Sequence, residues 1–156
     1  MSSNAVTVKV WNQFTRDEVF EMAKLRSDVF FLEQRITEEE LDRFDRQPTT
    51  RHYWTEDRDG FAAYLRVVSS EPKSAAQSTP SLSVGRVVVR PDRRGEGLAQ
   101  VLMQRVIADS GREPLMLHSQ VYVADLYRKF GFREVGDSFD EAGIPHIGMV
   151  RPANGD

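Results

Sequence analysis

The chain has 156 residues, of which 40% are hydrophobic and none is cysteine, and it carries a formal net charge of −3. This length predicts one domain with its own core, and the lack of cysteine excludes disulfides, thiolate metal sites and a cysteinyl acyl-enzyme. The slightly acidic balance gives no overall reason to bind nucleic acid or an anionic membrane, and no apolar run approaches the roughly 18 residues of a membrane span, so we expect a cytoplasmic protein.

The first half of the chain predicts a strand, two helices and a hairpin. Valines alternate with polar residues over 6–10, which is typical of a half-buried strand. Thr15 and Glu18 have capping-box spacing and begin a helix that should run to about Phe31. The same spacing recurs at Thr37 and Glu40 and predicts a short second helix. Two strands, 52–55 and 61–68, follow and are joined by a turn at 57–60.

The second half predicts strands around two helices within one domain that spans 4–151 and has disordered termini. Residues 69–83 are rich in Ser, Pro, Ala and Gln, so we expect an exposed loop there rather than a domain boundary. The run Val87, Val88 and Val89 suits a strand that is buried on both faces. Later elements are a helix over 98–111, a strand at 115–117, a helix over 121–130, and strands at 132–135 and 144–150. This order predicts an α/β domain with a mixed sheet.

Two glycines stand between the valine strand and the helix that begins near Leu98. Gly95 and Gly97 can adopt positive φ and carry no Cβ, so successive backbone N–H groups can point into one concavity. The free N–H groups of the helix's first turn open onto the same concavity, and both features favour an anion. We expect a pyrophosphate here, although a plain turn and helix cap is the alternative. A dinucleotide loop fits worse, because Gln100 stands where a third glycine would be.

The spacing Arg94-x-x-Gly97-x-Ala99 resembles the acyl-CoA signature of the GCN5-related N-acetyltransferase (GNAT) family. Residues 124–132 are similar to that family's helix-to-strand segment, which ends in Leu-Tyr, two residues, a hydrophobe and Gly-Phe. Residues 25–34, His52 and 143–146 resemble its ElaA-like branch, from which Ala142 departs because the branch tends to have an acid there. The resemblance covers the whole chain and implies a mostly antiparallel sheet of about seven strands with about four helices. Strands four and five would splay to admit acyl-CoA.

The resemblance also implies which residues meet acetyl-CoA, the cosubstrate. Backbone groups of Val87, Val88 and Val89 would pair with pantetheine, and one N–H there would polarise the thioester carbonyl. Tyr127 resembles the family tyrosine that protonates the departing sulfur, while packing in the core is the alternative for its ring. The pyrophosphate would be held by Arg94, Gly95, Glu96, Gly97, Leu98 and Ala99.

Three further groups of residues are candidates for the acceptor side. Glu33 either lies on the helix surface or faces the acceptor and helps to remove its proton. The acidic run 38–45 is most simply the solvated face of the short second helix, but it could also attract a cationic amine. His52, His118 and His146 are far apart in sequence and form no His-x-x-x-His pair, so we expect no metal site. We expect hydrogen-bonded structural histidines, and a catalytic base is the alternative for each of them.

These features predict an enzyme that moves an acetyl group from acetyl-CoA to a primary amine by direct attack in a ternary complex. The acceptor would be a small molecule or a peptide, and the protein a monomer or homodimer without a metal ion. Two alternatives stay open. An acyl-homoserine-lactone-synthase-like acyltransferase shares the fold and an Arg-x-x-Val-Phe pattern, which Arg26, Val29 and Phe30 match. A non-catalytic CoA-binding sensor or adapter is the other.

Overall fold

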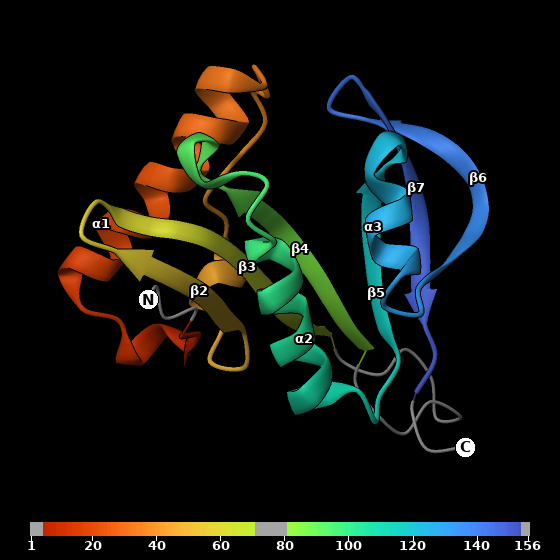
Figure 1. Cartoon of the computed structure of the whole chain (residues 1–156), viewed down its shortest axis with the longest axis horizontal. Helices are drawn as coiled ribbons and strands as arrows, with labels where there is room; N and C mark the ends of the chain where they lie inside the picture. Colours follow the sequence, from red (N-terminus) through yellow and green to blue (C-terminus); the bar gives the residue numbers. More distant parts are fainter. Residues whose placement is uncertain (1–4, 71–80, 154–156) are drawn as a thin grey trace.

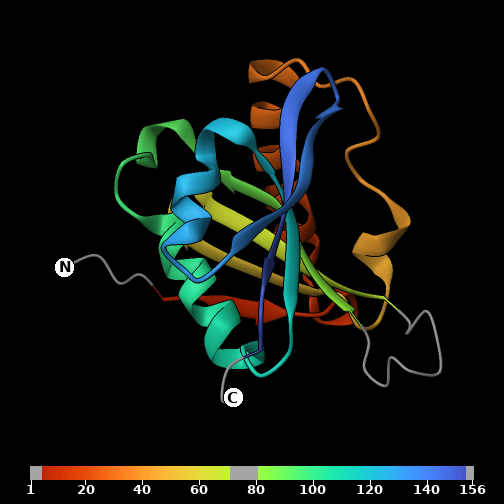
Figure 2. The same cartoon turned by 90° about the vertical axis from the view of Figure 1, so that its right-hand side faces the viewer.

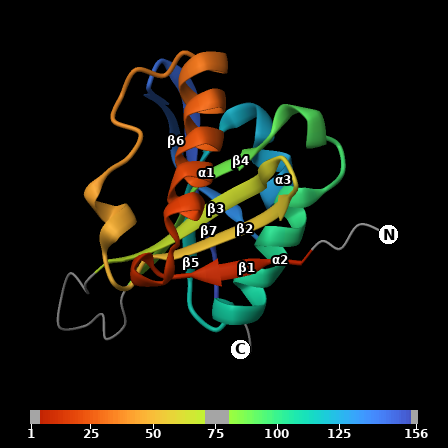
Figure 3. The same ribbon diagram turned by 90° about the vertical axis from the view of Figure 1, so that its left-hand side faces the viewer.

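The computed structural model describes residues 5–70 and 81–153 and shows a seven-stranded sheet with helices on both faces (Figures 1 and 3). The strand order is β1-β2-β3-β4-β5-β7-β6, and all neighbours are antiparallel except β4 and β5. The predicted fold class is therefore confirmed. The strands are β1 (Thr7–Lys9), β2 (Arg51–Asp57), β3 (Gly60–Ser70), β4 (Ser81–Val89), β5 (Leu115–Gln120), β6 (Arg133–Glu141) and β7 (Ile144–Arg151); the α-helices are α1 (Arg16–Arg26), α2 (Leu98–Ser110) and α3 (Ala124–Arg128).

Both faces of the sheet's centre are buried. Helices α2 and α3 cover one face, where Leu102 and Val106 pack against the strands, and α1 covers the other with Met22 and Leu25. Residues 61–67 of β3 are all buried between these layers, which explains why this strand is a largely apolar run rather than an alternating pattern. None of the described helices is both long and apolar enough to cross a membrane.

The predicted second helix is wrong. Residues 36–42 have no α-helix, and a single 3-10 turn, Arg43–Arg46, follows them. The Glu40 carboxylate does not cap a helix at Thr37, because it accepts hydrogen bonds from Arg26 Nε (2.6 Å) and Arg86 Nε (3.1 Å) instead. The attraction of these arginines therefore overrides the local capping signal, and residues 36–42 form an irregular segment with bends.

The predicted loop over 69–83 is too long at both ends. Strand β3 continues to Ser70 and β4 begins at Ser81. Leu82 is only 6% exposed, because alternation along β4 places it in the core between two serines. The middle of that loop, 71–80, and the termini expected to be disordered, 1–4 and 154–156, lie outside the described residues.

The fourth and fifth strands splay apart, as the family resemblance implied. Strand β4 pairs with β5 only at Leu82–Leu115 and Ser83–Met116, and no further pair joins them along their described lengths. Figure 1 shows the two strands close at one end and apart at the other, and Figure 2 shows β5, β6 and β7 running steeply across the direction of β2, β3 and β4. The sheet is therefore open along most of one edge of β4.

A buried ionic network connects α1, β3 and the segment before β2. The guanidinium group of Arg26 has no exposed surface and donates to both carboxylate oxygens of Asp45, at 2.8 and 3.2 Å. Arg66 of β3 donates to Asp45 (2.8 Å) and to Asp42 (2.7 Å). Burial alone would raise the pKa of Asp45, but the hydrogen bonds and charges of the two arginines lower it. The acidic run is thus not a solvated face at Asp45, which is 3% exposed.

Replacing Arg26 by Leu should lower the free energy of unfolding by about 3 to 5 kcal/mol, because Asp45 would lose a partner inside the protein. In the same helix, Lys24 makes an exposed ion pair with Asp28 at 2.6 Å. Lys24→Met is the control and should change stability by less than about 0.5 kcal/mol. Urea unfolding of both variants measures the difference, and equal small losses would show that the buried network contributes no more than a surface pair.

Candidate functional site

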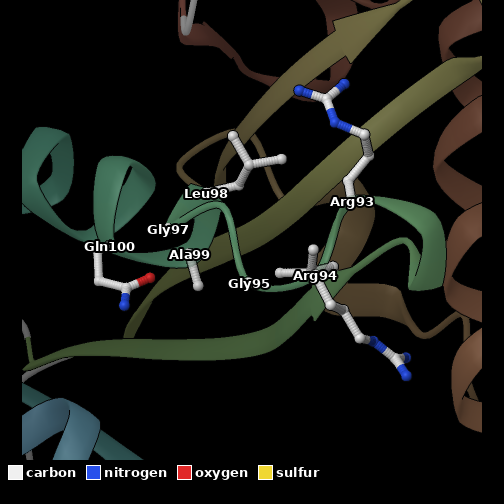
Figure 4. Close-up of a pocket in the computed structure, with 8 residues that line it drawn as sticks. Arg93, Arg94, Gly95, Gly97, Leu98, Ala99 and Gln100 are labelled. Atoms are coloured by element: carbon white, nitrogen blue, oxygen red, sulfur yellow. The ribbon is translucent and has the colours of Figure 1, made fainter.

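A cavity of about 1120 Å³ fills the opening between β4 and β5. Its walls are residues 83–89 of β4, residues 117–120 of β5, and the segment 29–40. This segment begins in the π-helix Ser27–Glu33, which continues α1, and runs on without helix to Glu40. Tyr127 of α3 and His146 of β7 also line it. A smaller hollow of about 170 Å³ adjoins this cavity at the glycine loop, and Arg94 and Gly95 line both spaces (Figure 4). One continuous site therefore reaches from the glycine loop to the β6–β7 hairpin.

The glycine loop has the backbone conformation that its sequence predicts. Gly95 and Gly97 have φ of +84° and +80°, in the left-handed region that favours glycine, and Gly97 immediately precedes α2. A Cβ added at Gly95 would meet no atom within 4 Å, and one at Gly97 would meet only the Gln100 side chain, at 3.9 Å. Both positions open into the small hollow, so a side chain there would fill the space that a phosphate group needs.

The other loop residues divide into backbone and side-chain contributors. Leu98 is 2% exposed and packs in the core, so only its backbone can face a ligand. Glu96 pairs with Arg93 at 2.8 Å, which leaves its carboxylate away from the pyrophosphate position that we expected for the loop. Arg94 and Arg93 extend in different directions (Figure 4). Arg94 is therefore the guanidinium group that remains as a side-chain candidate for an anion.

The valine strand presents backbone to the cavity. Val88 is 4% exposed and pairs with Tyr64 of β3, while the opposite edge of β4 has no strand partner beyond Ser83 among the described residues. Val87 and Val89 pack against the core that α2 and α3 cover. The valine side chains thus pack in the core, while the backbone groups on the unpaired edge of β4 face the cavity. This geometry is compatible both with a buried strand and with backbone contacts to pantetheine.

A bulge in β4 turns its backbone at this point. Arg86 has φ of +54°, and the register between β3 and β4 shifts beside it. Positive φ is unfavourable for a residue with a Cβ, and the Arg86 side chain is held by Glu40 Oε2 (3.1 Å) and Asp42 Oδ2 (3.3 Å). The ionic network that fixes the segment before β2 therefore also stabilises the bulge that faces the cavity.

Glu33 and Arg94 are direct partners, although we expected Glu33 beside the acceptor and Arg94 beside the pyrophosphate. Arg94 donates from both terminal nitrogens to both Glu33 oxygens, at 2.8 and 2.7 Å. The hydrogen bond from Arg94 lowers the pKa of Glu33, so this carboxylate is a weak base while the pair is intact. The sequence could not show this contact, since the two residues are 61 positions apart.

Tyr127 belongs to both the core and the cavity wall. It is 8% exposed, and its ring meets Phe132 edge-on with centroids 6.0 Å apart. Burial raises the pKa of its hydroxyl to about 12. Because the ring packs in the core while the residue lines the cavity, the position fits both interpretations, and the role of the hydroxyl stays a prediction.

The three histidines have different surroundings. His52 has no exposed surface, contacts Tyr64 Oη (2.7 Å) and Asp45 O (3.0 Å), and has its pKa lowered to about 4 by burial. It is structural, as expected. His118 and His146 instead line the cavity on either side of Glu141, an arrangement that the sequence analysis missed. Only the pairing of β5 with β7 could have indicated it.

Comparison with known proteins gives consistent results. Residues 11–152 match the acetyltransferase (GNAT) domain family. A UPF0039 protein of Mycobacterium tuberculosis is 35% identical over 138 residues, which are 88% of this chain and 86% of that protein. The structure of an acyl-CoA N-acyltransferase from Pseudomonas aeruginosa has a TM-score of 0.82 and 31% identity, covering 94% of this chain and 98% of that one. The Escherichia coli ElaA structure has a TM-score of 0.81, 28% identity and the same coverage, 94% and 98%.

Gly97→Val should weaken CoA binding at least tenfold, because its side chain would project into the hollow beside Arg94. Valine at positive φ also costs about 1 to 2 kcal/mol of stability. Gly136→Val is the matched control, since Gly136 has φ of +75°, open space around it and no place in either hollow. Calorimetric titration with CoA, together with melting curves, separates the two effects. Equal affinity of both variants would remove the loop from the binding site.

Proposed function

Because this chain belongs to the GNAT family and to its ElaA-like branch, we propose that it transfers an acetyl group from acetyl-CoA to a primary amine by direct attack. The family is one of acyl-CoA-dependent acyltransferases, and the sheet's opening suits an acyl-CoA. The observation that carries the proposal is the loss of pairing between β4 and β5 after two residue pairs, with the left-handed glycines at the end of the same opening. Pantetheine can then satisfy the free backbone groups of β4 while the glycine loop holds the pyrophosphate.

In the proposed reaction the chain supplies positions and charges rather than a nucleophile. A backbone N–H of 87–89 hydrogen-bonds the thioester oxygen as negative charge develops on it. The amine nitrogen attacks the carbonyl carbon, and the carbon–sulfur bond breaks as the tetrahedral intermediate collapses. Tyr127 donates its proton to the departing sulfur. The absence of cysteine supports direct transfer over a thiol acyl-enzyme, and we place the reaction in the cytoplasm.

A screen of amine acceptors with acetyl-CoA tests this function. Free thiol release should depend on the amine, and mass spectrometry should find the acetylated product. Amine-independent thiol release would indicate hydrolysis instead. CoA binding without any product across lysine peptides, N-terminal amines, polyamines and amino sugars would support a sensor or adapter.

The alternative of an acyl-homoserine-lactone-synthase-like enzyme gains no support from its shared pattern. Arg26 of the Arg-x-x-Val-Phe sequence is buried in the ionic network, and Val29 is 3% exposed in the core under α1. For Arg26 the pattern therefore describes packing rather than a substrate contact, whereas Val29 packs in the core and also lines the cavity. Long-chain acyl-CoA donors in the same screen distinguish the two functions by their products.

Tyr127→Phe should lower kcat about 10²- to 10⁴-fold if its hydroxyl protonates the sulfur, while stability changes by about 1 kcal/mol. Tyr53→Phe is the control, because Tyr53 is buried outside the cavity and its hydroxyl donates to Asp109 Oδ2 at 3.0 Å. That variant should lose stability and keep its turnover. Normal turnover in Tyr127→Phe would assign the tyrosine to the core alone.

We further propose that Glu33 binds the positively charged acceptor once the pyrophosphate competes for Arg94. Glu33→Gln should raise the KM of the amine several-fold. CoA should bind as tightly as in the wild type or more tightly, since Arg94 loses its competing partner. Steady-state kinetics and CoA titration check both expectations, and an unchanged amine KM would remove Glu33 from the acceptor site.

A further inference from the structure

Two histidines and a glutamate meet on one wall of the cavity through the pairing of β5, β6 and β7. Along β5, Leu115 and Leu117 are buried under α2 and α3, so His118 lies on the opposite face of the sheet. In β7, Ile147 faces the same core, which places His146 on the face of His118. The register pairs His118 with Gly148 and Gln120 with His146, so the two imidazoles are diagonal neighbours.

Glu141 lies between the two rings. His118 Nδ1 is 3.0 Å from Glu141 Oε1, and His146 Nε2 is 3.6 Å from Glu141 Oε2. Phe139 meets the His118 ring edge-on, with centroids 5.0 Å apart, and lies nearly parallel to the His146 ring. The side chains of the β6–β7 hairpin therefore hold both imidazoles in defined orientations.

These contacts determine where the free lone pair of each neutral ring lies. An ionised carboxylate only accepts, so His118 Nδ1 donates to Glu141 and the His118 lone pair is on Nε2. His146 Nδ1 donates to the carbonyl oxygen of Ile144 at 2.7 Å, so the His146 lone pair is on Nε2, beside Glu141. His118 is 59% exposed at its side chain and lines the cavity, whereas His146 is 9% exposed. Of the two rings, His118 has the base nitrogen that an acceptor can reach.

We propose that His118 is the general base that removes a proton from the acceptor ammonium, with Glu141 as its positioning residue. This inference rests on the proposed amine acetylation. Glu141 holds the Nδ1–H tautomer and stabilises the imidazolium that forms, as a carboxylate does for histidine in other active sites. His146 contacts the second Glu141 oxygen and limits how the carboxylate can rotate.

The arrangement places the base and the acid on opposite faces of the sheet. Tyr127 packs with the core under α2 and α3, while His118 lies on the face toward α1. Both residues line the same cavity, which passes between β4 and β5. An amine on the α1 side can therefore lose its proton to His118 while the sulfur of CoA receives one on the other side.

The proton balance of the step is complete. An alkylammonium with a pKa near 10.4 gives one proton to His118 Nε2, and the resulting neutral amine forms the new bond to the thioester carbon. When the carbon–sulfur bond breaks, the sulfur takes the proton of Tyr127, and the second proton lost by the nitrogen returns through solvent to the Tyr127 oxygen. The products are the amide, the CoA thiol and one proton, which His118 releases to solvent.

Charged groups face His118 from both sides of the cavity. Glu141 from β6 and His146 from β7 are its direct neighbours. Across the cavity, the charged lining residues come from the segment 29–40, from β3 and β4, and from the glycine loop. They are Glu33, Glu38, Glu39, Glu40, Arg66, Arg86 and Arg94. Of these, Arg66, Arg86, Glu40, Glu33 and Arg94 take part in ion pairs of their own.

The test compares two acceptors in the His118→Gln variant. With an alkylammonium acceptor from the screen, kcat/KM should fall about 10²-fold or more. With a hydrazide, which is uncharged at neutral pH and needs no deprotonation before attack, the rate should stay within a few-fold of the wild type. The wild-type kcat/KM should fall toward acidic pH, because a protonated imidazole cannot accept the proton of the ammonium, and this limb should disappear in the variant. Met116→Gln, on the same strand and face but outside the cavity lining, is the control.

A second pair of variants tests the positioning role. Glu141→Gln keeps a hydrogen-bond acceptor for His118 but removes the charge, so the acidic limb of the profile should move to lower pH and kcat should fall. Asp140→Asn removes a neighbouring carboxylate outside the cavity lining and should leave the profile unchanged. Equal losses with both acceptors in His118→Gln, or an unchanged acidic limb, would overturn the assignment. A wild-type protein that acylates no amine at all would overturn the proposed function, and the base with it.

Discussion

The guanidinium group of Arg26, enclosed at the end of α1, connects this helix to the segment before β2 and, through it, to β3 and β4. It binds Asp45 and Glu40, and these acids in turn bind Arg66 in β3 and Arg86 in β4. A buried guanidinium requires carboxylate partners such as these two, because an uncompensated charge in the interior is costly. The segment before β2 is therefore held by side chains of β3 and β4, and residues 38–40 of it line the cavity.

The same network stabilises an unfavourable backbone conformation at Arg86, in the wall of the cavity. Arg86 keeps a positive φ because its side chain is held by the acids that Arg26 and Arg66 also bind. The bulge and the early loss of pairing between β4 and β5 leave backbone groups of β4 facing the cavity. Such groups are unfavourable unless they meet water or a ligand, so the fold carries a preformed edge for an extended polar molecule.

Charge also connects the two ends of the cavity. Arg94 lies in the glycine loop and donates to Glu33, the last residue of the π-helix that continues α1. A pyrophosphate at the loop and a carboxylate at the acceptor end would compete for one guanidinium group. In the proposed reaction, donor binding would thereby release Glu33 for the acceptor and couple the two substrates.

The sequence by itself determined the features that depend on neighbouring residues: the apolar strands, the capping box at Thr15, the left-handed glycines at 95 and 97, and the motifs of the family. It predicted a solvated position for Asp45, which is buried. It also could not pair Glu33 with Arg94 or place Glu141 between His118 and His146. These contacts join residues 19 to 61 positions apart, or depend on strand register. Local propensity acts over a few residues, whereas the surroundings of a charge are decided by which strands become neighbours, and only the tertiary structure decides that.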